Sequence, residues 1–486
     1  MSPCEIHAGL VTRTRLRAPL LAAIAAGLLT SCSPIGDPEP DADADPESAP
    51  GDQVGTTTAE LGRHGRRDFV VADGTGLRLH GRPYHFVGTN YWQAMNLASR
   101  GPGGDRARFL RELDALRDAG ITNLRIMAIT EGPDSEMLRI VPALVQAPGV
   151  YDEDLLDGLD FAIAAMRQRG MKAVMTLGNE WHWSGGFGQY LVWTGAADSI
   201  PYPPPREGGD WDEYQRFVSQ FYGDPDAVSL YLENIENLVE RVNRYTHTRY
   251  RDEPAIMAWE LANEPRALQQ TSAYLDWIAT SAAFIKQLDP NHLVTTGSEG
   301  DTSSPSYSGT EYLRDHSAGG IDYGTAHFWV QNWGWYDPLR AEETYGPATD
   351  RARAYIASHV ERTALLDKPI VFEEFGLARD QQSFDPDSTV AWRDRYYGEM
   401  LDDLVDFAQE GQVAGTNSWA WAGEGRPVSP FGLWWVPGDP FIGDPPHEQQ
   451  GWYSIYDTDA STMAVIAERA DAMSDLDCRR GADAAW

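Results

Sequence analysis

The sequence predicts an α/β protein that folds as a (β/α)8 TIM barrel, and three observations lead to this fold class. Eight short apolar segments have the character of buried strands, amphipathic segments of helical periodicity separate them, and the two kinds alternate from about residue 84 onward. Strands that are buried on both faces and joined by helices are typical of parallel sheets covered by helices. A doubly wound open sheet is the alternative, but no GxGxxG motif follows a first strand.

The predicted elements begin with an N-terminal β-hairpin cap. Residues 69–83 carry short apolar runs around turn signals at Asp73-Gly74 and Gly81, which favours short antiparallel strands. The eight barrel strands are then expected, in chain order, at residues 84–92, 122–129, 171–179, 255–263, 292–298, 323–330, 368–375 and 413–421. These segments are short and apolar, as strands inside a barrel must be.

The segments between the strands predict the surrounding helices. In residues 152–170 the apolar side chains from Leu155 to Met166 recur at helical spacing. Two longer connections, residues 180–223 and 422–460, follow the third and eighth strands, and in this fold such loops lie on the face that carries active sites. The other helices are expected at residues 106–119, 224–246, 272–288, 310–317, 349–367, 389–410 and 461–474.

The first 67 residues differ from the rest in composition. Residues 1–32 resemble an export signal, with three arginines, the apolar run APLLAAIAAGLL and then LTSC, an ending that resembles the lipobox of bacterial lipoproteins. This resemblance implies that Cys32 is lipidated as the mature N-terminus, and Ser33 favours the outer membrane or cell surface; secretion after ordinary cleavage is the alternative. Residues 33–67, rich in Asp, Pro, Gly and Thr, predict a disordered linker, and residues 68–486 a single catalytic domain.

Charge and motif content restrict the partners and cofactors. The net charge of −34, from 73 acidic and 39 basic residues, would repel a polyanion, so a nucleic-acid partner is not expected. The segment HEQQG at 447–451 lacks the second histidine of HExxH, and no other metal-binding pattern is present. We expect a monomer that needs neither a metal nor another cofactor.

Two of the predicted strands end in a glutamate. Glu264 lies between Asn263 and Pro265 at the end of the fourth strand, and Glu374 precedes Phe375 at the end of the seventh. A pair of carboxyl groups facing one cleft is what cleavage of a glycosidic bond needs: one acid protonates the leaving oxygen, and one carboxylate attacks the anomeric carbon or activates water. For either glutamate alone, a solvated strand-end residue is the alternative.

The motifs WELANEP and FEEFG resemble glycoside hydrolase family 5, the retaining barrel hydrolases of clan A, and the similarity runs from about residue 84 to 470. The resemblance implies that Glu264 is the acid/base and Glu374 the nucleophile, with the two carboxyl groups about 5–5.5 Å apart. Successive side chains of a strand point to opposite faces, so Glu373 is not expected to enter the cleft beside Glu374. Glu260, four residues deeper than Glu264, is expected to be structural.

The resemblance also implies roles for residues around the pair. Arg125 would hold Glu374 ionised, Asn263 would bind the 2-hydroxyl of the sugar, and His327 would lie in the cleft. Many family members carry a tyrosine two residues after this histidine as a donor to the nucleophile. Here the residue is Trp329, whose indole N–H can donate but not accept, so the support of the nucleophile is expected to be rearranged.

Aromatic residues at predicted strand ends suggest a site for sugars, because flat apolar rings stack on sugar faces. Trp419, in GTNSWAW, corresponds to the family tryptophan beneath the sugar at the cleavage site. Trp92, Asn179 and Trp181 are further candidates for substrate binding; for a single tryptophan, packing in the core is the alternative.

Arg266 bears on the choice of sugar. The segments NEPR, LGNEWHWSGGFGQYLVW and GDPPHEQQGWYSIYDTD resemble the β-1,4-mannanase branch, in which the arginine binds a mannosyl unit on the leaving-group side. The resemblance implies endo-acting, retaining hydrolysis of β-1,4 bonds in mannan, galactomannan or glucomannan. The alternatives are a family 5 endo-β-1,4-glucanase, an exo-acting β-mannosidase or mannobiohydrolase, and a non-catalytic glycan-binding lipoprotein.

Overall fold

The computed structural model describes residues 68–483, and for residues 478–483 only the backbone. The predicted signal peptide, the lipidation site at Cys32 and the linker 33–67 lie outside the described residues. Within the described part of the chain, none of the helices combines the length and the apolar character needed to cross a membrane.

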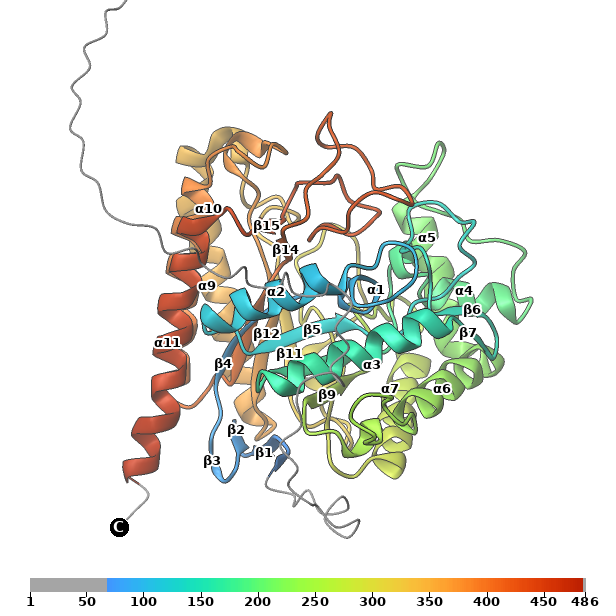
Figure 1. Ribbon diagram of the computed structural model, residues 1–486, viewed down its shortest axis with the longest axis horizontal. Helices are drawn as coiled ribbons and strands as arrows, with labels where there is room; N and C mark the ends of the chain where they lie inside the picture. The colour runs from blue at the N-terminus through green and yellow to red at the C-terminus, as the bar shows by residue number, and fades with distance from the viewer. Residues whose placement is uncertain (1–67, 484–486) are drawn as a thin grey trace, which may run out of the picture. The chain divides into compact units, whose positions relative to one another are not determined.

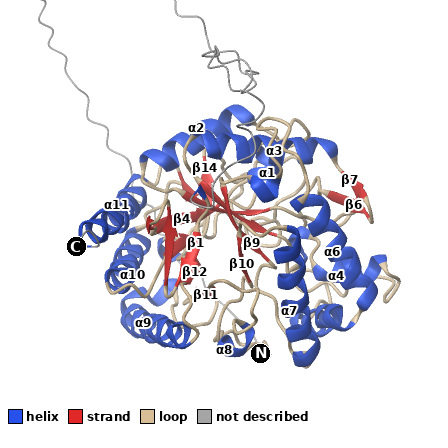
Figure 2. Cartoon of the chain, turned by 90° about the horizontal axis from the view of Figure 1, so that it is seen from below, coloured by secondary structure: helices blue, strands red, loops and turns tan. Residues whose placement is uncertain are grey.

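The predicted barrel is confirmed. Eight parallel strands form one sheet in the order β10-β9-β8-β5-β4-β13-β12-β11, and helices surround them (Figure 2). The two outer strands of this order approach each other where the Asp322 N–H donates to the Val294 carbonyl at 2.8 Å, so the sheet is nearly closed. All eight strands fall inside the predicted segments: β4 (Phe86–Asn90), β5 (Asn123–Met127), β8 (Lys172–Thr176), β9 (Ile256–Glu260), β10 (Leu293–Thr295), β11 (Gly324–Phe328), β12 (Ile370–Phe375) and β13 (Gly415–Ser418).

The predicted helices are also present. Several begin at an aspartate whose side chain accepts a backbone N–H of the first turn: Asp105 accepts from Arg108, and Asp152 from Leu155. The eight helices are α2 (Arg106–Asp118), α3 (Glu153–Gln168), α6 (Pro225–Val239), α7 (Thr271–Leu288), α8 (Tyr312–Asp315), α9 (Ala341–Leu365), α10 (Ala391–Gln409) and α11 (Ala460–Asp483).

Three helix boundaries differ clearly from the prediction, and one of them is the end of α11, which extends to Asp483 rather than to residue 474. Helix α6 ends at Val239 rather than near residue 246, because the Asn243 side chain accepts the N–H groups of Tyr245 and Thr246 and holds a turn there. Helix α9 begins at Ala341, before Pro347, where the sequence suggested a later start. Three short helices, which were not predicted, lie in connections: α1 (Ala94–Leu97), α4 (Phe187–Trp193) and α5 (Trp211–Val218).

A small antiparallel sheet closes the N-terminal end of the barrel, as predicted for the cap. It consists of β1 (Val71–Asp73), β2 (Gly76–Leu79) and β3 (Arg82–Pro83), drawn at the bottom of Figure 1. Leu77 of the cap belongs to one apolar cluster with Val174 and Met257 from the barrel strands. This cluster fills the lower part of the barrel.

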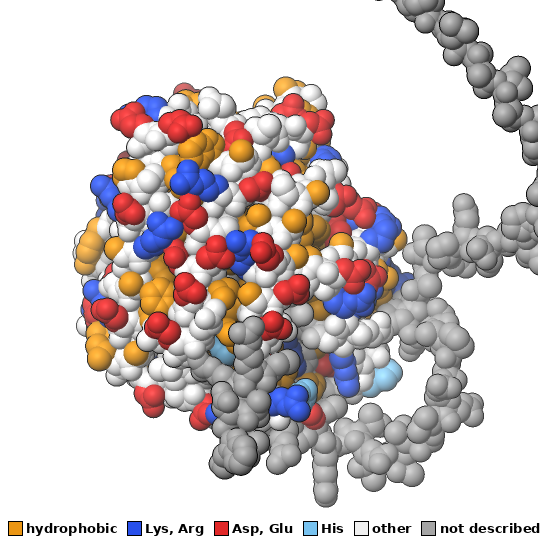
Figure 3. Space-filling model, turned by 90° about the vertical axis from the view of Figure 1, so that its left-hand side faces the viewer, with side chains coloured by type: hydrophobic (Ala, Val, Ile, Leu, Met, Phe, Trp, Pro, Cys, Tyr) orange, Lys and Arg blue, Asp and Glu red, His pale blue; other side chains and the backbone are white. Residues whose placement is uncertain are grey.

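Connections at the opposite end carry two further pairs of short strands. They are β6 (Val145–Ala147) with β7 (Val150–Tyr151), and β14 (Trp421–Gly423) with β15 (Ile455–Tyr456). The connection from β14 to β15 is the long loop predicted after the eighth strand, and it lies over the top of the barrel in Figure 1. The face formed by α9, α10 and α11 shows acidic and basic side chains interspersed (Figure 3). One ion pair between these helices joins Arg353 of α9 to Asp403 of α10.

One irregularity in the barrel changes the prediction for Glu373. Across β11 and β12, Ala326 pairs with Phe372 but His327 pairs with Glu374, so the register shifts by one residue at Glu373. Such a bulge interrupts the alternation of faces. Glu373 and Glu374 both lie close to Arg125 inside the barrel, at 3.9 Å for Glu373 and in direct contact for Glu374. The argument from strict alternation was therefore wrong, although Glu373 stays below the cleft.

Candidate active site

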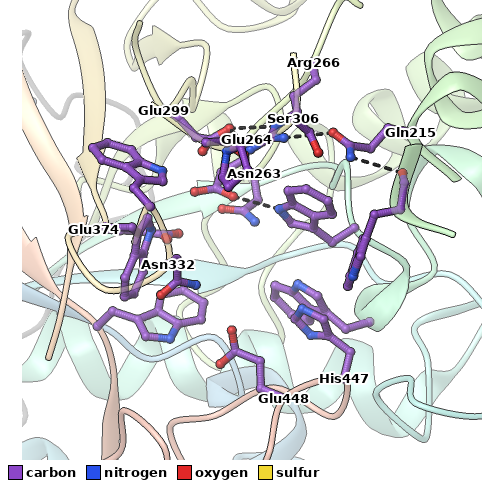
Figure 4. A pocket seen from close by; sticks show the side chains of 18 of the residues that line it. Gln215, Asn263, Glu264, Arg266, Glu299, Ser306, Asn332, Glu374, His447 and Glu448 are labelled. Carbon is purple, nitrogen blue, oxygen red and sulfur yellow. Dashed lines mark hydrogen bonds and ion pairs between the residues drawn. The ribbon is translucent and has the colours of Figure 1, made fainter. Parts of the chain in front are cut away.

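A cavity of about 420 Å³ opens at the C-terminal ends of the barrel strands (Figure 4). Its wall combines indole rings with buried polar groups, which suits a ligand with flat apolar faces and many hydroxyls. The lining residues are Trp181, Trp183, Trp211, Gln215, Asn263, Glu264, Arg266, Glu299, Ser304, Pro305, Ser306, Trp329, Asn332, Trp333, Glu374, Trp419, His447, Glu448 and Trp452.

Glu264 and Glu374 face each other in this cavity. One carboxylate oxygen of each and a ring nitrogen of His327 all lie within 4.8 Å of one another. This close approach of two oxygen atoms is compatible with the pair of a retaining glycosidase, whose carboxyl groups lie about 5–5.5 Å apart. Glu264 has φ of +50°, and its N–H donates to the Gly297 carbonyl, so the backbone is held in an uncommon conformation beyond the end of β9.

Neutral hydrogen-bonding groups surround the Glu264 carboxyl. The indole N–H of Trp181 donates to Oε2 at 2.7 Å, and Nδ1 of His327 lies 2.7 Å from Oε1. Burial raises the pKa of Glu264, while the positive charge of Arg266 and the indole N–H groups of Trp181 and Trp329 oppose the increase. Burial lowers the pKa of His327 to about 3, so this imidazole is neutral at ordinary pH.

A guanidinium holds the Glu374 carboxyl. Arg125 on β5 donates from Nη1 to Oε1 of Glu374, and Nδ1 of His327 lies 3.5 Å from Oε2. Burial raises the pKa of Glu374, and the Arg125 charge opposes that increase. The Trp329 indole N–H opposes the rise in the pKa of Glu264, so the residue that stands where many family members have a tyrosine acts on the other carboxyl group.

Comparison with known proteins decides the family. The family model described as GH family 5 beta-mannosidase-like matches residues 67–477. The chain belongs to glycoside hydrolase family 5. It is therefore a glycoside hydrolase, and its barrel is that of the family.

Relatives and solved structures agree with this membership. A putative mannan endo-1,4-β-mannosidase 4 of Arabidopsis thaliana is 31% identical over 74% of this chain and 84% of its own length. A family 5 mannosidase from Rhizomucor miehei is 36% identical with a TM-score of 0.78, covering 85% of this chain and all of its own. An endo-β-1,4-mannanase from Thermotoga petrophila is 25% identical with a TM-score of 0.58, over 80% of this chain and 76% of its own.

Arg266 of this family 5 chain lies in the cavity wall. It is 4% exposed, pairs with Glu299 through Nε at 2.8 Å, and donates from Nη1 to Gln215 at 2.8 Å. Its guanidinium lies over the Trp181 ring at 4.9 Å. The side chain is thus both paired with an acid and fixed in place beside Glu264, which Figure 4 shows.

The two asparagines predicted to bind substrate differ in position. Asn263 lines the cavity, with Oδ1 accepting from Arg125 at 2.8 Å and Nδ2 donating to Asn179 at 3.1 Å. Asn179 lies behind it, fully buried, and its Oδ1 also accepts the backbone N–H of Trp181. The prediction that Asn179 contacts substrate was wrong: its polar atoms hold Asn263 and Trp181.

The tryptophans predicted to bind substrate also differ in position. Trp181, Trp329 and Trp419 line the cavity, and the Trp419 indole N–H is buried without a partner among the described residues. Trp92 does not line it, because its N–H donates to the Gly443 carbonyl at 2.7 Å and its ring packs against Trp183. Trp92 is therefore a packing residue, the alternative that the sequence left open.

The loop between β14 and β15 contributes residues that the sequence analysis missed. His447, Glu448 and Trp452 line the cavity, and Oε2 of Glu448 is buried without a hydrogen-bond partner among the described residues. Burial, with the charges of Asp444 and Glu264, raises the pKa of Glu448 well above its usual value. HEQQG was weighed as a metal motif and, within GDPPHEQQGWYSIYDTD, as part of the resemblance to mannanases, but its side chains were given no role in the site. Its place beside GW in a long loop after the eighth strand was the usable signal.

By spacing, one cluster of ligand-type side chains within residues 68–477 could hold a metal ion: Glu264, His327 and Glu374. Two of its atoms already have partners, since Nδ1 of His327 bonds to Glu264 and Oε1 of Glu374 to Arg125. A guanidinium in contact with one of the carboxylates also disfavours a second cation there. The arrangement suits acid/base and nucleophilic chemistry by the carboxyl groups themselves.

Proposed function

We propose that this family 5 hydrolase is an endo-β-1,4-mannanase that cleaves internal bonds of mannan, galactomannan or glucomannan with retention of configuration. The observation that carries the proposal is the close approach of Glu264 and Glu374, with one carboxylate oxygen of each within 4.8 Å, and of these two carboxyl groups only Glu374 is bonded to Arg125. Relatives named mannan endo-1,4-β-mannosidases, 31% and 29% identical over 74% and 83% of this chain, support the choice of substrate.

In the first step a carboxylate oxygen of Glu374 attacks the anomeric carbon and forms a bond to it. The bond between that carbon and the leaving sugar oxygen breaks. Glu264 donates its proton to that oxygen. In the second step Glu264 removes a proton from water, the water oxygen bonds to the anomeric carbon, and Glu374 is released as a carboxylate. The proton starts on Glu264 because only Glu374 receives a charge-assisted hydrogen bond from Arg125.

The surrounding groups place the sugar for these steps. Trp419 offers a flat ring in the cavity wall, and Asn263, whose Nδ2 donates to Asn179, lines the same cavity and has a second amide N–H for a sugar hydroxyl. Arg266 and Gln215 lie on the side of Glu264, where the leaving part of the chain would extend. Trp181 fixes the acid and forms part of the same wall.

A second candidate, an exo-acting β-mannosidase, is favoured by one observation. His447, Glu448 and Trp452, from the loop over the barrel, form a wall of the cavity with a buried carboxyl group. A wall that closes the groove beyond the reacting sugar would admit only a chain end. The R. miehei family 5 mannosidase has the higher TM-score of the two structures compared above, 0.78 against 0.58.

A product assay separates these candidates. Purified enzyme is incubated with mannan, galactomannan, glucomannan and cellulose, and products are followed by chromatography together with solution viscosity. An endo-acting mannanase lowers the viscosity early and releases mixed oligosaccharides; release of mannose alone from the first time points would identify the exo-acting candidate. Preference for cellulose would contradict both. Glu264→Gln and Glu374→Gln serve as the inactive controls.

The site of action is proposed from residues 1–32. The enzyme is anchored as a monomer to the bacterial outer membrane or cell surface through a lipid on Cys32. Incorporation of a labelled fatty acid in wild type and in Cys32→Ser, combined with membrane fractionation, tests this. If the Cys32→Ser variant remains in the membrane fraction and wild type takes up no label, the protein is not lipid-anchored at this position. Size-exclusion chromatography with light scattering tests the oligomeric state.

A further inference from the structure

Three buried glutamates surround a single arginine beneath the cavity. Glu260 on β9 and Glu373 and Glu374 on β12 are at most 3% exposed, and all three lie near Arg125 of β5. Ionisation of all three would leave two uncompensated negative charges in the interior of the barrel. Buried charge without compensation is costly, so one of the three is expected to carry a proton.

Arg125 has no hydrogen bond left for Glu373. A guanidinium has five N–H groups. Nε and one Nη2 N–H bond to the two oxygens of Glu260 at 2.8 and 2.6 Å, and one Nη1 N–H bonds to Glu374. The remaining two bond to Asn90 at 3.0 Å and to Asn263 at 2.8 Å. Glu373 comes only within 3.9 Å of Nε.

The contacts of Glu373 itself fit a neutral carboxyl group. The Tyr323 hydroxyl donates to Oε1 at 3.3 Å, whereas Oε2 is buried and has no donor among the described residues. Two ionised carboxylates cannot hydrogen-bond to each other, but a protonated one can donate to the other. Burial and then the charge on Glu260 raise the pKa of Glu373 well above its usual value, against the opposing charge of Arg125.

We infer that Glu373 is a positioning residue of this hydrolase, which keeps a proton and donates that O–H to the ionised carboxylate of Glu260. Glu260 then binds Arg125 through both oxygens, and Arg125 presents its Nη1 N–H to Glu374. The effect on catalysis rests on the proposed role of Glu374 as the nucleophile; the protonation of Glu373 does not.

The charged and titratable groups around Glu373 make this testable by pH. They come from five elements or their ends: Arg125 on β5, Glu260 on β9, Glu374 on β12, and the hydroxyls of Tyr323 before β11 and of Tyr312 on α8. The acidic limb of kcat/KM reports the ionisation of the nucleophile in the free enzyme. A neutral Glu373 adds no charge beside Glu374, whereas an ionised one would raise the pH of that limb.

The matched variants are Glu373→Gln and Glu373→Leu, which both remove an ionisable group but differ in their ability to donate to Glu260. We expect Glu373→Gln to keep the acidic limb and at least about half of kcat. In Glu373→Leu, Glu260 loses the hydrogen bond from Glu373 and attracts Arg125 more strongly. Arg125 then stabilises the ionised form of Glu374 less, so the acidic limb moves to higher pH. A shift to lower pH in both variants would mean that Glu373 is ionised in wild type. An acidic limb at the wild-type pH in both variants would mean that Glu373 does not position Arg125 beside Glu374.

Infrared difference spectroscopy provides a readout that does not depend on activity. At neutral pH the wild type should show a carbonyl band of a protonated carboxylic acid that is missing from Glu373→Gln, even if the Leu variant does not fold. Equal bands in the two proteins would overturn the inference. If the band is lost while Glu374→Gln stays active, the proton assignment stands and the proposed catalytic role of Glu374 fails.

Discussion

The barrel has a hollow at each end, and the two differ in chemistry far more than in size. The upper one, about 420 Å³, contains Glu264 and Glu374, while the lower one, about 340 Å³, lies against the cap and contains Asp73, Arg78 and Arg82. Seven tryptophans line the upper hollow and none lines the lower. Volume alone would not tell the two apart.

The difference lies in how each end treats its charges. Glu264 and Glu374 are 8% and 3% exposed, and burial raises the pKa of both. In the lower hollow the Arg78 and Asp73 side chains are 45% and 57% exposed, so solvent screens their ion pair. Buried carboxyl groups that control each other's protonation can transfer protons and form covalent bonds during a reaction. Exposed charges that solvent screens are not coupled in this way. Function is therefore expected only at the upper end.

The largest effect should come from the carboxyl pair. Glu374→Gln should lower kcat on mannan on the order of 10⁴-fold, because the covalent step is lost. Glu264→Gln should lose about 10²- to 10⁴-fold on mannan, but much less on an aryl mannoside whose leaving group needs no proton. Initial rates measure both. Asp73→Asn in the lower hollow is the control and should retain wild-type rates; a loss comparable to that of Glu264→Gln would break the comparison.

A smaller effect is expected at Arg266. Arg266→Lys keeps the charge but cannot make the paired contacts with Glu299 and Gln215. For oligosaccharides that extend past the cleaved bond, kcat/KM should fall about tenfold, equal to about 1.4 kcal/mol. For aryl mannosides it should change little. An equal loss on both substrates would show that Arg266 acts by holding the wall together and not by binding the leaving part of the chain.

Many residues at the upper, catalytic end of the barrel could be predicted from the sequence, because barrel strands bring them there. Glu264 and Glu374 follow or end apolar segments that had to be barrel strands, and parallel strands bring their C-terminal ends to one face. Arg125 and His327 lie within two other such strands. Local sequence contained that information.

What could not be predicted depends on contacts between distant segments. The bulge at Glu373 is set by pairing with β11, and the sequence of β12 alone favours strict alternation. Asn179 and Trp92 follow strands as substrate-binding residues do, but their polar atoms bond to Asn263 and to the Gly443 carbonyl. Such partners are known only once the loops are folded.

A buried carboxyl beside the site makes stability depend on pH. Burial raises the pKa of Glu180 to about 8, against the charge of Arg266, from an ordinary value of 4.5. The folded state therefore favours the protonated form. Its contribution to stability is complete below about pH 4.5 and is lost as the pH rises through 8. Glu180→Gln should show a smaller fall in melting temperature between pH 5 and 8.5 than wild type, measured by calorimetry. An equal fall in both proteins would show that Glu180 is not the group responsible.

The smallest effect is expected in the lower hollow. Arg78→Ala removes the Nε contact with Asp73 and a hydrogen bond of 3.3 Å to the Gly81 carbonyl, both at the surface. Since water replaces these contacts, the melting temperature should change by only a few degrees and kcat/KM on mannan should stay at the wild-type value. Paired calorimetry and rate measurements test this. A change in rate without a change in stability would mean that the cap communicates with the catalytic end, and would remove the contrast between the two hollows.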